Sequence, residues 1–155
     1  QPGVADAVFE ANTANFLRNM YRTRHWLEAP PELGDGMALL SVATAESMPG
    51  DLLMSEEELQ VFVTAFEHSG FTGPINWYRN LSRNWELLED APARVLCPTL
   101  MIHGDHDMVP PLENLADFVP HAEVVSLECG HWIMQEEPQQ TNDLILKWLL
   151  KNYPA

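Results

Sequence analysis

Two short apolar runs, each followed by a polar turn, constrain the fold of this chain more than any other feature. The runs Thr99-Leu100-Met101-Ile102 and Val124-Val125-Ser126-Leu127 have the length of buried strands. A helical segment follows each run, the first after Pro110-Pro111 and the second after Pro138. Near-continuous apolar strands that alternate with helices are typical of a parallel sheet covered on both faces. We therefore predict an α/β fold, and we expect further strands outside this chain because two strands do not make a stable sheet alone.

The sequence before this region has the period of helices. It predicts a helical domain over residues 1–81, followed by an α/β part over residues 82–155. Apolar residues spaced by three, four and seven positions predict one amphipathic helix over residues 8–21. Prolines and glycines punctuate residues 28–50, which are predicted to form a long loop. No strand is expected in the helical domain.

Two further helices are predicted in this domain. Ser55 and Glu58 have the spacing of a capping box, which marks the start of a helix, and Ser69-Gly70 marks its end. Gly73-Pro74 introduces the next helix, which is expected to run through residues 76–80.

The aromatic residues near this last helix have two possible uses. Most such side chains pack in a core, and we expect that of Trp77 and Trp85. Tyr78 is different, because a phenol above a pocket can donate a hydrogen bond to a developing oxyanion. The residues alone leave its role open between packing and catalysis.

Composition limits the partners of the chain. With 23 acidic and 8 basic residues, the formal net charge is −15, which disfavours nucleic acid, anionic membranes and anionic substrates. A neutral or apolar substrate fits better. No window has the roughly 18 apolar residues of a membrane span. The two cysteines, Cys97 and Cys129, are too few to stabilise a secreted domain by disulfide bonds. Both are expected to be free thiols that are buried and pack as small apolar side chains.

The turns that follow the two apolar runs carry the side chains that could take part in catalysis. Asp105 and Asp107 come after the first run, and His131 follows the second run and Gly130. Because the carboxyl ends of parallel strands meet at one sheet edge, a carboxylate and an imidazole are expected side by side there. That pair is the acid–histidine half of a hydrolytic triad, and either aspartate qualifies by type.

These turns have two other interpretations. Turn aspartates are often simply solvated, and His131 could stack on Trp132. A metal site built from His103, Asp105, His106 and Asp107 is disfavoured, because strand alternation puts His103 and Asp105 on one side and His106 on the other.

Three motifs together resemble the epoxide hydrolases of the soluble type, which have the α/β-hydrolase fold. The segment from Ser69 to Asn80 (Ser-Gly-Phe-Thr-Gly-Pro-Ile-Asn-Trp-Tyr-Arg-Asn) is similar to their cap-domain signature. His103-Gly104-Asp105-His106-Asp107 and Cys129-Gly130-His131-Trp132 are similar to their acid and histidine motifs. Pro2-Gly3-Val4-Ala5 also resembles the start of the cap segment. The resemblance implies a helical cap followed by the C-terminal part of the core.

The resemblance also implies a reaction and its residues. An aspartate opens the epoxide to form a covalent ester, which water hydrolyses to a vicinal diol. Asp107 would orient His131, His131 would be the base, and Tyr78 would be one of two tyrosines that activate the epoxide. The family needs no cofactor and no metal for this reaction.

The chain departs from the family pattern in what it lacks. The glycine-x-nucleophile-x-glycine elbow and the oxyanion loop do not occur, and Gly34-Asp35-Gly36 follows Pro30-Pro31 instead of a strand. The second cap tyrosine is also absent, because Tyr21 lies too far along the first helix. We expect an N-terminal half with the nucleophilic aspartate and the oxyanion loop, since the chain begins at Gln1 without a methionine. This chain alone is expected to be inactive.

Other functions stay open at this stage. The alternatives are a haloalkane dehalogenase or an esterase of the same fold, and a non-catalytic binding module. A small apolar epoxide and water are the expected substrates, a homodimer is possible, and the expected location is the cytoplasm. The residues expected to line the substrate pocket are apolar: Trp26, Met48, Leu53, Met54, Phe71, Ile75, Trp132 and Met134.

Overall fold

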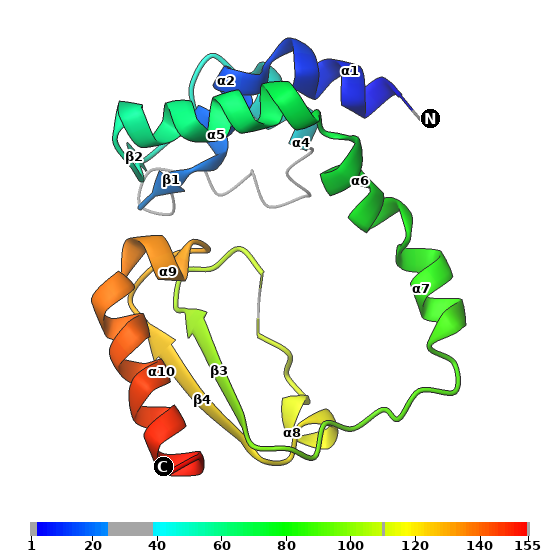
Figure 1. The fold of residues 1–155 in the computed structure, drawn as a ribbon, viewed down its shortest axis with the longest axis vertical. Coiled ribbons are helices and arrows are strands. Elements are labelled where there is room, and N and C mark those ends of the chain that lie inside the picture. Colours follow the sequence, from blue (N-terminus) through cyan, green and yellow to red (C-terminus); the bar gives the residue numbers. More distant parts are fainter. Residues whose placement is uncertain (1–2, 25–38, 110, 155) are drawn as a thin grey trace. The chain divides into compact units, whose positions relative to one another are not determined.

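The computed structural model describes residues 3–24, 39–109 and 111–154. The chain forms two compact units, Gln1–Asp90 and Ala91–Ala155, and each is described by itself (Figure 1). The sequence predicts a division after residue 81, and in the structure helix α7 (Leu81–Leu87) falls in the first unit.

Helices dominate the first unit. They are α1 (Val4–Ala11), α2 (Thr13–Met20), α4 (Leu39–Thr44), α5 (Glu56–Ser69), α6 (Thr72–Arg79) and α7. The buried faces of α1, α2, α4 and α5 meet in one apolar cluster together with Phe71, and Phe9, Phe16 and Phe71 in it are 5%, 8% and 2% exposed. The rings of Phe9 and Phe16 have centroids 4.5 Å apart, and those of Phe9 and Phe71 are 5.3 Å apart. The helical domain therefore has a core of its own.

The prediction of a single helix over residues 8–21 is wrong, because the helix is interrupted at Asn12. The backbone of Asn12 leaves the helical region, with φ −132° and ψ 26°. Its side-chain amide donates to the carbonyl of Val8 at 2.8 Å. Asparagine often bonds to nearby backbone in this way, and the bond competes with helix continuation. The apolar period survives the break, because α1 and α2 both turn their apolar faces to the same core.

The predicted loop over residues 28–50 contains a helix in its described part. Helix α4 buries Val42 and Ala43, which are 2% and 0% exposed. The side chain of Asn19 donates to the carbonyl of Val42 at 3.0 Å, and that of Asn15 donates to the carbonyl of Ala43 at 2.9 Å. Tertiary packing and these amide bonds stabilise a helix too short to stand alone.

The expectation that the first unit has no strand is also wrong. Strands β1 (Arg22–Thr23) and β2 (Asp51–Leu52) form an antiparallel ladder. Each strand has only two residues, which is too short for a recognisable alternation of apolar and polar positions.

The two predicted helices in the second half of this unit are confirmed. Ser55 caps α5 as a capping box: the amide of Glu58 donates to the Ser55 hydroxyl at 3.2 Å, and the amide of Ser55 donates to Glu58 Oε2 at 2.8 Å. The helix ends at Ser69, and the next residue, Gly70, has a φ of 68°, which favours glycine. The expected burial of Trp77 and Trp85 is wrong for this chain, in which they are 74% and 80% exposed. They lie on α6 and α7, whose residues are not buried in this unit.

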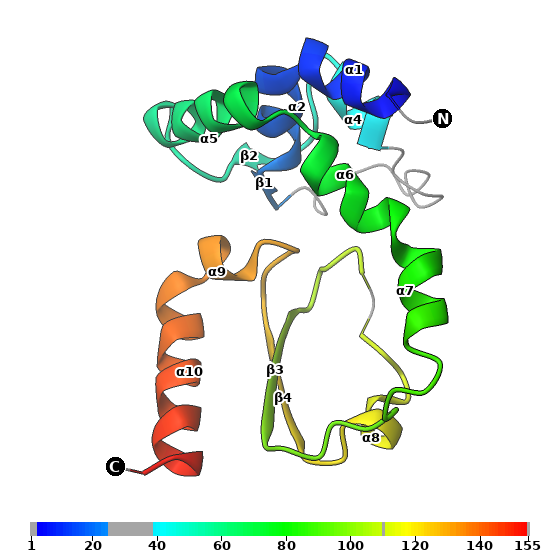
Figure 2. The ribbon, with the colours of Figure 1, turned by 45° about the vertical axis from the view of Figure 1, so that its right-hand side comes forward.

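The second unit confirms the predicted strand–helix–strand–helix order. Strands β3 (Thr99–Gly104) and β4 (Ala122–Leu127) pair in parallel, from Thr99 opposite Ala122 to Gly104 opposite Leu127. The elements after them are α9 (Ile133–Glu136) and α10 (Pro138–Asn152), and α8 (Leu115–Phe118) connects the strands. In both views α10 lies along one side of the strands, while α8 lies on the other (Figure 2). Among the residues described, no helix has the length and apolar character needed to cross a membrane.

Candidate active site

The two strands of the second unit end together, and their following turns are joined by backbone hydrogen bonds. The amide of Asp105 donates to the carbonyl of Leu127 at 2.8 Å, and the amide of His106 donates to the carbonyl of Cys129 at 3.1 Å. A side chain at Gly104 would collide with the carbonyls of Cys129 and Gly130. Glycine at position 104 therefore allows the two turns to approach closely.

This approach brings Asp107 and His131 into contact, as the sequence predicted. Nδ1 of His131 lies 2.8 Å from Oδ1 of Asp107. The Asp107 side chain is 13% exposed and the His131 side chain is 36% exposed, so the carboxylate is sheltered while the imidazole reaches the surface. Because a carboxylate can only accept, Nδ1 of His131 is assigned as the donor, which leaves Nε2 to accept a proton.

The neighbours of this pair hold the carboxylate and the ring in place. Oδ1 of Asp107 also accepts from the amide of Val109 at 2.9 Å. The ring of His131 meets that of Trp132 edge-on, with centroids 5.2 Å apart. The alternative contact expected for His131, with Trp132, is therefore present together with the contact to Asp107. Asp105 is exposed, and its backbone amide joins the turns.

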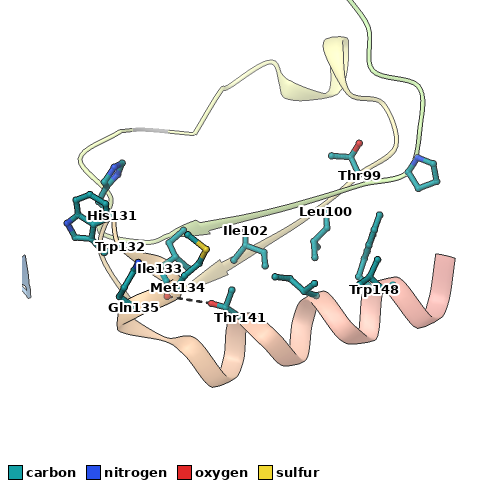
Figure 3. Close-up of a pocket in the computed structure, with 13 residues that line it drawn as sticks. Thr99, Leu100, Ile102, His131, Trp132, Ile133, Met134, Gln135, Thr141 and Trp148 are labelled. Atoms are coloured by element: carbon teal, nitrogen blue, oxygen red, sulfur yellow. Dashed lines mark hydrogen bonds between the residues drawn. The ribbon is translucent and has the colours of Figure 1, made fainter. Parts of the chain in front are cut away.

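A hollow of about 700 Å³ extends from His131 along the sheet. Figure 3 shows His131 and Trp132 at one end and Trp148 at the other, with Leu100 and Ile102 projecting from β3 between them. Its lining is predominantly apolar. Of the residues expected to bind substrate, Trp132 and Met134 lie here, and Met134 is 67% exposed.

Tyr78 lies in the other unit, near the C-terminal end of α6, and is 62% exposed. The helix that carries it is tied to α1 by the carboxylate of Asp6. Oδ1 of Asp6 accepts from the Thr72 hydroxyl at 2.8 Å, and Oδ2 accepts from Nη2 of Arg79 at 2.5 Å. Thr72 and Arg79 are the first and last residues of α6, so one carboxylate holds both ends of the helix.

The environment of Asp6 favours its ionised form. The hydrogen bonds from Arg79, and then from Thr72, hold the pKa of the Asp6 carboxyl well below its usual range. The amide of Gly3 adds a further donor at 3.1 Å. The side chains of Asp6 and Arg79 are only 12% and 30% exposed.

The remaining residues expected to line a substrate pocket lie in the first unit. Phe71 is a core residue, 2% exposed, and stacks on Phe66 with ring centroids 4.8 Å apart. Three others, Met48, Met54 and Ile75, are partly buried against the same core. Leu53 is also half-buried. Trp26 lies outside the described residues.

The two cysteines differ from the expectation that both are buried. Cys129 is 2% exposed, whereas Cys97 is exposed. Burial, followed by the negative charge of Glu136 and other acids, raises the pKa of the Cys129 thiol to about 11. Within the described segments, no three His, Cys, Asp or Glu side chains are grouped to hold a metal ion.

Two carboxylates that support predicted site residues, one in each unit, were missed by sequence reasoning. Asp6 accepts hydrogen bonds from side chains of α6, the helix that carries Tyr78. Glu136 accepts from backbone amides of the turn that carries His131. Asp6 stands three residues after Gly3, a spacing that marks a helix start. Glu136 stands four residues after Trp132, close enough to reach back over one helical turn.

Known epoxide hydrolases are similar in sequence to this chain. Bifunctional epoxide hydrolase 2 of Rattus norvegicus is 34% identical over 96% of this chain and 28% of its own length. Epoxide hydrolase A of Mycobacterium tuberculosis is 30% identical over 96% of this chain and 49% of its own length. No protein-family model matches the chain.

Solved structures give the same result. Epoxide hydrolase A from Mycobacterium thermoresistibile has a TM-score of 0.81 and 31% identity over 96% of this chain and 49% of its own. Potato (Solanum tuberosum) epoxide hydrolase I has a TM-score of 0.73 and 31% identity over 97% of this chain and 50% of its own.

The fold of this chain and these structural similarities identify it as part of an α/β-hydrolase fold, as the sequence predicted. The chain is homologous to the epoxide hydrolases of that fold, and the predicted resemblance is confirmed. It spans 28% of the rat relative and about half of the mycobacterial one.

Proposed function

We propose that the protein containing this chain hydrolyses epoxides to vicinal diols, and that this chain supplies the base, its acid partner and one activating phenol. The observation that carries the proposal is the 2.8 Å contact between His131 and Asp107, at the joined ends of two parallel strands in a chain homologous to epoxide hydrolases. The N-terminal half of the same enzyme is proposed to supply a nucleophilic aspartate and an oxyanion loop. Neither element occurs in this sequence, so this chain alone is inactive in the proposal.

The first step is the opening of the ring. A carboxylate oxygen of the nucleophile attacks an epoxide carbon, the carbon–oxygen bond of the ring breaks, and its electron pair stays on the epoxide oxygen. The Tyr78 phenol donates a proton or a hydrogen bond to that oxygen, which lowers the cost of the developing alkoxide. The product of this step is a covalent hydroxyalkyl ester of the enzyme.

The second step is hydrolysis of the ester. Nε2 of His131 accepts a proton from water while the water oxygen attacks the ester carbonyl carbon. The bond between that carbon and the diol oxygen then breaks, the diol oxygen takes up a proton, and the enzyme carboxylate is restored. Asp107 keeps the proton on Nδ1 and stabilises the imidazolium that forms, because its carboxylate faces Nδ1 at 2.8 Å.

Each of the two units is proposed to have its own role in the reaction. The first is proposed to be a helical cap that presents Tyr78, and the second is part of the catalytic core. Trp132 and Met134 beside His131 are apolar, and the formal net charge of −15 disfavours anionic substrates. Both features support a small apolar epoxide as substrate. The proposed lining from the cap is Trp26, Met48, Leu53, Met54 and Ile75. Phe71 is left out of it, because its side chain is 2% exposed inside the core of the first unit.

Two finer proposals concern the whole protein. A homodimer is proposed because the first unit exposes large apolar side chains, among them Trp77 at 74% and Trp85 at 80%. The cytoplasm is the proposed location. Sedimentation equilibrium and imaging of the tagged full-length protein test these two points.

The experiment that separates this function from its alternatives is the Tyr78→Phe substitution in the full-length protein. Turnover of styrene oxide and of 4-nitrophenyl acetate is measured for the wild type, Tyr78→Phe, and Tyr153→Phe as a matched control. Tyr153 is 57% exposed and belongs to the other unit, so removing its hydroxyl should leave both rates unchanged. We expect Tyr78→Phe to lose styrene oxide opening while any ester hydrolysis persists, because an ester does not need the phenol.

The other outcomes favour other functions. A wild-type protein that hydrolyses the ester and leaves styrene oxide intact would indicate an esterase. Release of halide from 1-chlorobutane without diol formation would indicate a dehalogenase. Binding of styrene oxide without any turnover would indicate a non-catalytic module.

A further inference from the structure

The backbone on both sides of His131 is bonded to one carboxylate. Oε2 of Glu136 accepts from the amide of Gly130, and Oε1 accepts from the amide of Trp132, each at 3.2 Å. The residue between these two amides is His131. Glu136 therefore spans the turn that carries the imidazole.

The turn needs such a partner because of its place in the chain. It joins the end of β4 to the start of α9, whose N-cap residue is Trp132 and has no capping side-chain bond of its own. The first amides of a helix lack partners within the helix. Glu136 is half-buried and satisfies one amide at the helix start and another inside the turn. Gly130 could otherwise adopt many backbone conformations, because glycine has no side chain to restrict it.

The imidazole is consequently held at two points. Its ring is held by Asp107 at Nδ1, and its backbone is held on either side through Glu136. A ring held at only one point can swing about that contact, and a small misplacement of a reacting group slows a reaction strongly. Glu136 supports the backbone of the turn, since it accepts from the amides of Gly130 and Trp132.

We propose that Glu136 is a positioning residue for His131, and that it acts on the ester-hydrolysis step and leaves the ring-opening step unaffected. The inference rests on the proposed function, in which His131 activates the water. Glu136 gives and takes no proton in it. Its contribution is to keep Nε2 of His131 aimed at the water while the ester is hydrolysed.

The test uses Glu136→Gln in the full-length protein. Glutamine has nearly the same shape but only one accepting oxygen, so one of the two amides loses its partner. Glu128→Gln is the matched control: it removes the same charge three residues before His131, from an exposed side chain. Glu136→Asp is a second variant, which keeps the charge on a shorter side chain.

The measurement is a single turnover of styrene oxide, quenched at successive times and followed by the intact mass of the protein. In Glu136→Gln we expect ester formation within about twofold of the wild-type rate and ester breakdown slowed by about tenfold or more. The covalent ester then accumulates. Glu136→Asp should slow breakdown less, and Glu128→Gln should match the wild type. A mutation that merely loosened the fold would change both steps alike.

Hydrogen exchange of the Gly130 and Trp132 amides supplies a readout that needs no substrate. Both should exchange faster in Glu136→Gln than in Glu128→Gln. Ester breakdown at the wild-type rate, or unchanged exchange at both amides, would overturn the proposal. A wild-type protein that forms neither ester nor diol refutes the proposed function itself, which is a different result from a wild-type ester that Glu136→Gln hydrolyses normally.

Discussion

Two valines on one helix allow the packing of the first unit to be tested with the same substitution twice. Val63 and Val61 both lie on α5, two residues apart. Val63 is 4% exposed and belongs to the apolar cluster, whereas Val61 is 68% exposed. Replacing each by alanine removes the same atoms from one helix, so any difference in stability comes from their surroundings.

The expected magnitude follows from this burial. Two buried carbon groups lost from Val63 cost about 0.8 kcal/mol each in transfer free energy, or about 1.6 kcal/mol together. The cavity adds roughly 1 kcal/mol, because neighbouring rings relax only partly. Alanine gains up to about 0.7 kcal/mol of helix propensity, but the gain is common to both variants and cancels in the comparison. Val63→Ala is therefore expected to be about 2–3 kcal/mol less stable than Val61→Ala.

Urea unfolding followed by circular dichroism measures this difference in the free energy of unfolding. Thermal unfolding gives a second readout: for a unit of this size, 1 kcal/mol shifts the melting temperature by about 4–8 °C, so the two melting temperatures should differ by about 8–24 °C. Val61→Ala should lie within about 0.5 kcal/mol of the wild type. Equal stabilities for the two variants would refute the placement of α5 and the existence of a separate core in this unit.

Three further predictions follow from the site and its surroundings. Asp107→Asn in the full-length protein should slow ester hydrolysis by about 10²–10⁴-fold, because an amide does not hold the histidine tautomer as a carboxylate does; unchanged quench-flow rates would contradict this role. The carboxyl of Asp6 has a lowered pKa in the folded protein, so its stabilising contribution is present above the ordinary value of 3.8 and is lost as pH falls below it. Acid titration of Asp6→Asn should accordingly show a shallower loss of stability below that pH than the wild type, and identical curves would contradict the effect. Iodoacetamide at pH 7.5 should label Cys97 and spare Cys129, whose thiol is buried and has a pKa raised to about 11, as peptide mass spectrometry would show; rapid labelling of both would contradict the buried turn.

The sequence was most informative where a feature repeats or is capped. The capping box at Ser55 predicted α5 within one residue of its observed start, and the apolar runs predicted the parallel pair β3 and β4. Because parallel strands end at one edge, the positions of Asp107 and His131 after their strands were enough to predict that the two side chains meet.

The features that could not be predicted depend on contacts between distant residues. The side chains of Asn15 and Asn19 bond to carbonyls of α4 and the segment after it, and no local pattern marks those bonds. The break at Asn12 left the apolar spacing intact, so periodicity could not reveal it. Glu136 resembles any acid on a short helix until its two amide partners are seen.

The measurement that tests the central claim most directly is the intact mass of the full-length His131→Gln variant after exposure to styrene oxide. If His131 activates water for ester hydrolysis, the variant should open the epoxide once and keep a stable adduct equal to one styrene oxide, without diol formation. His121→Gln, which changes an exposed histidine of the same unit, should form diol without a lasting adduct. Diol formation by His131→Gln at the wild-type rate, with no adduct, would contradict the account.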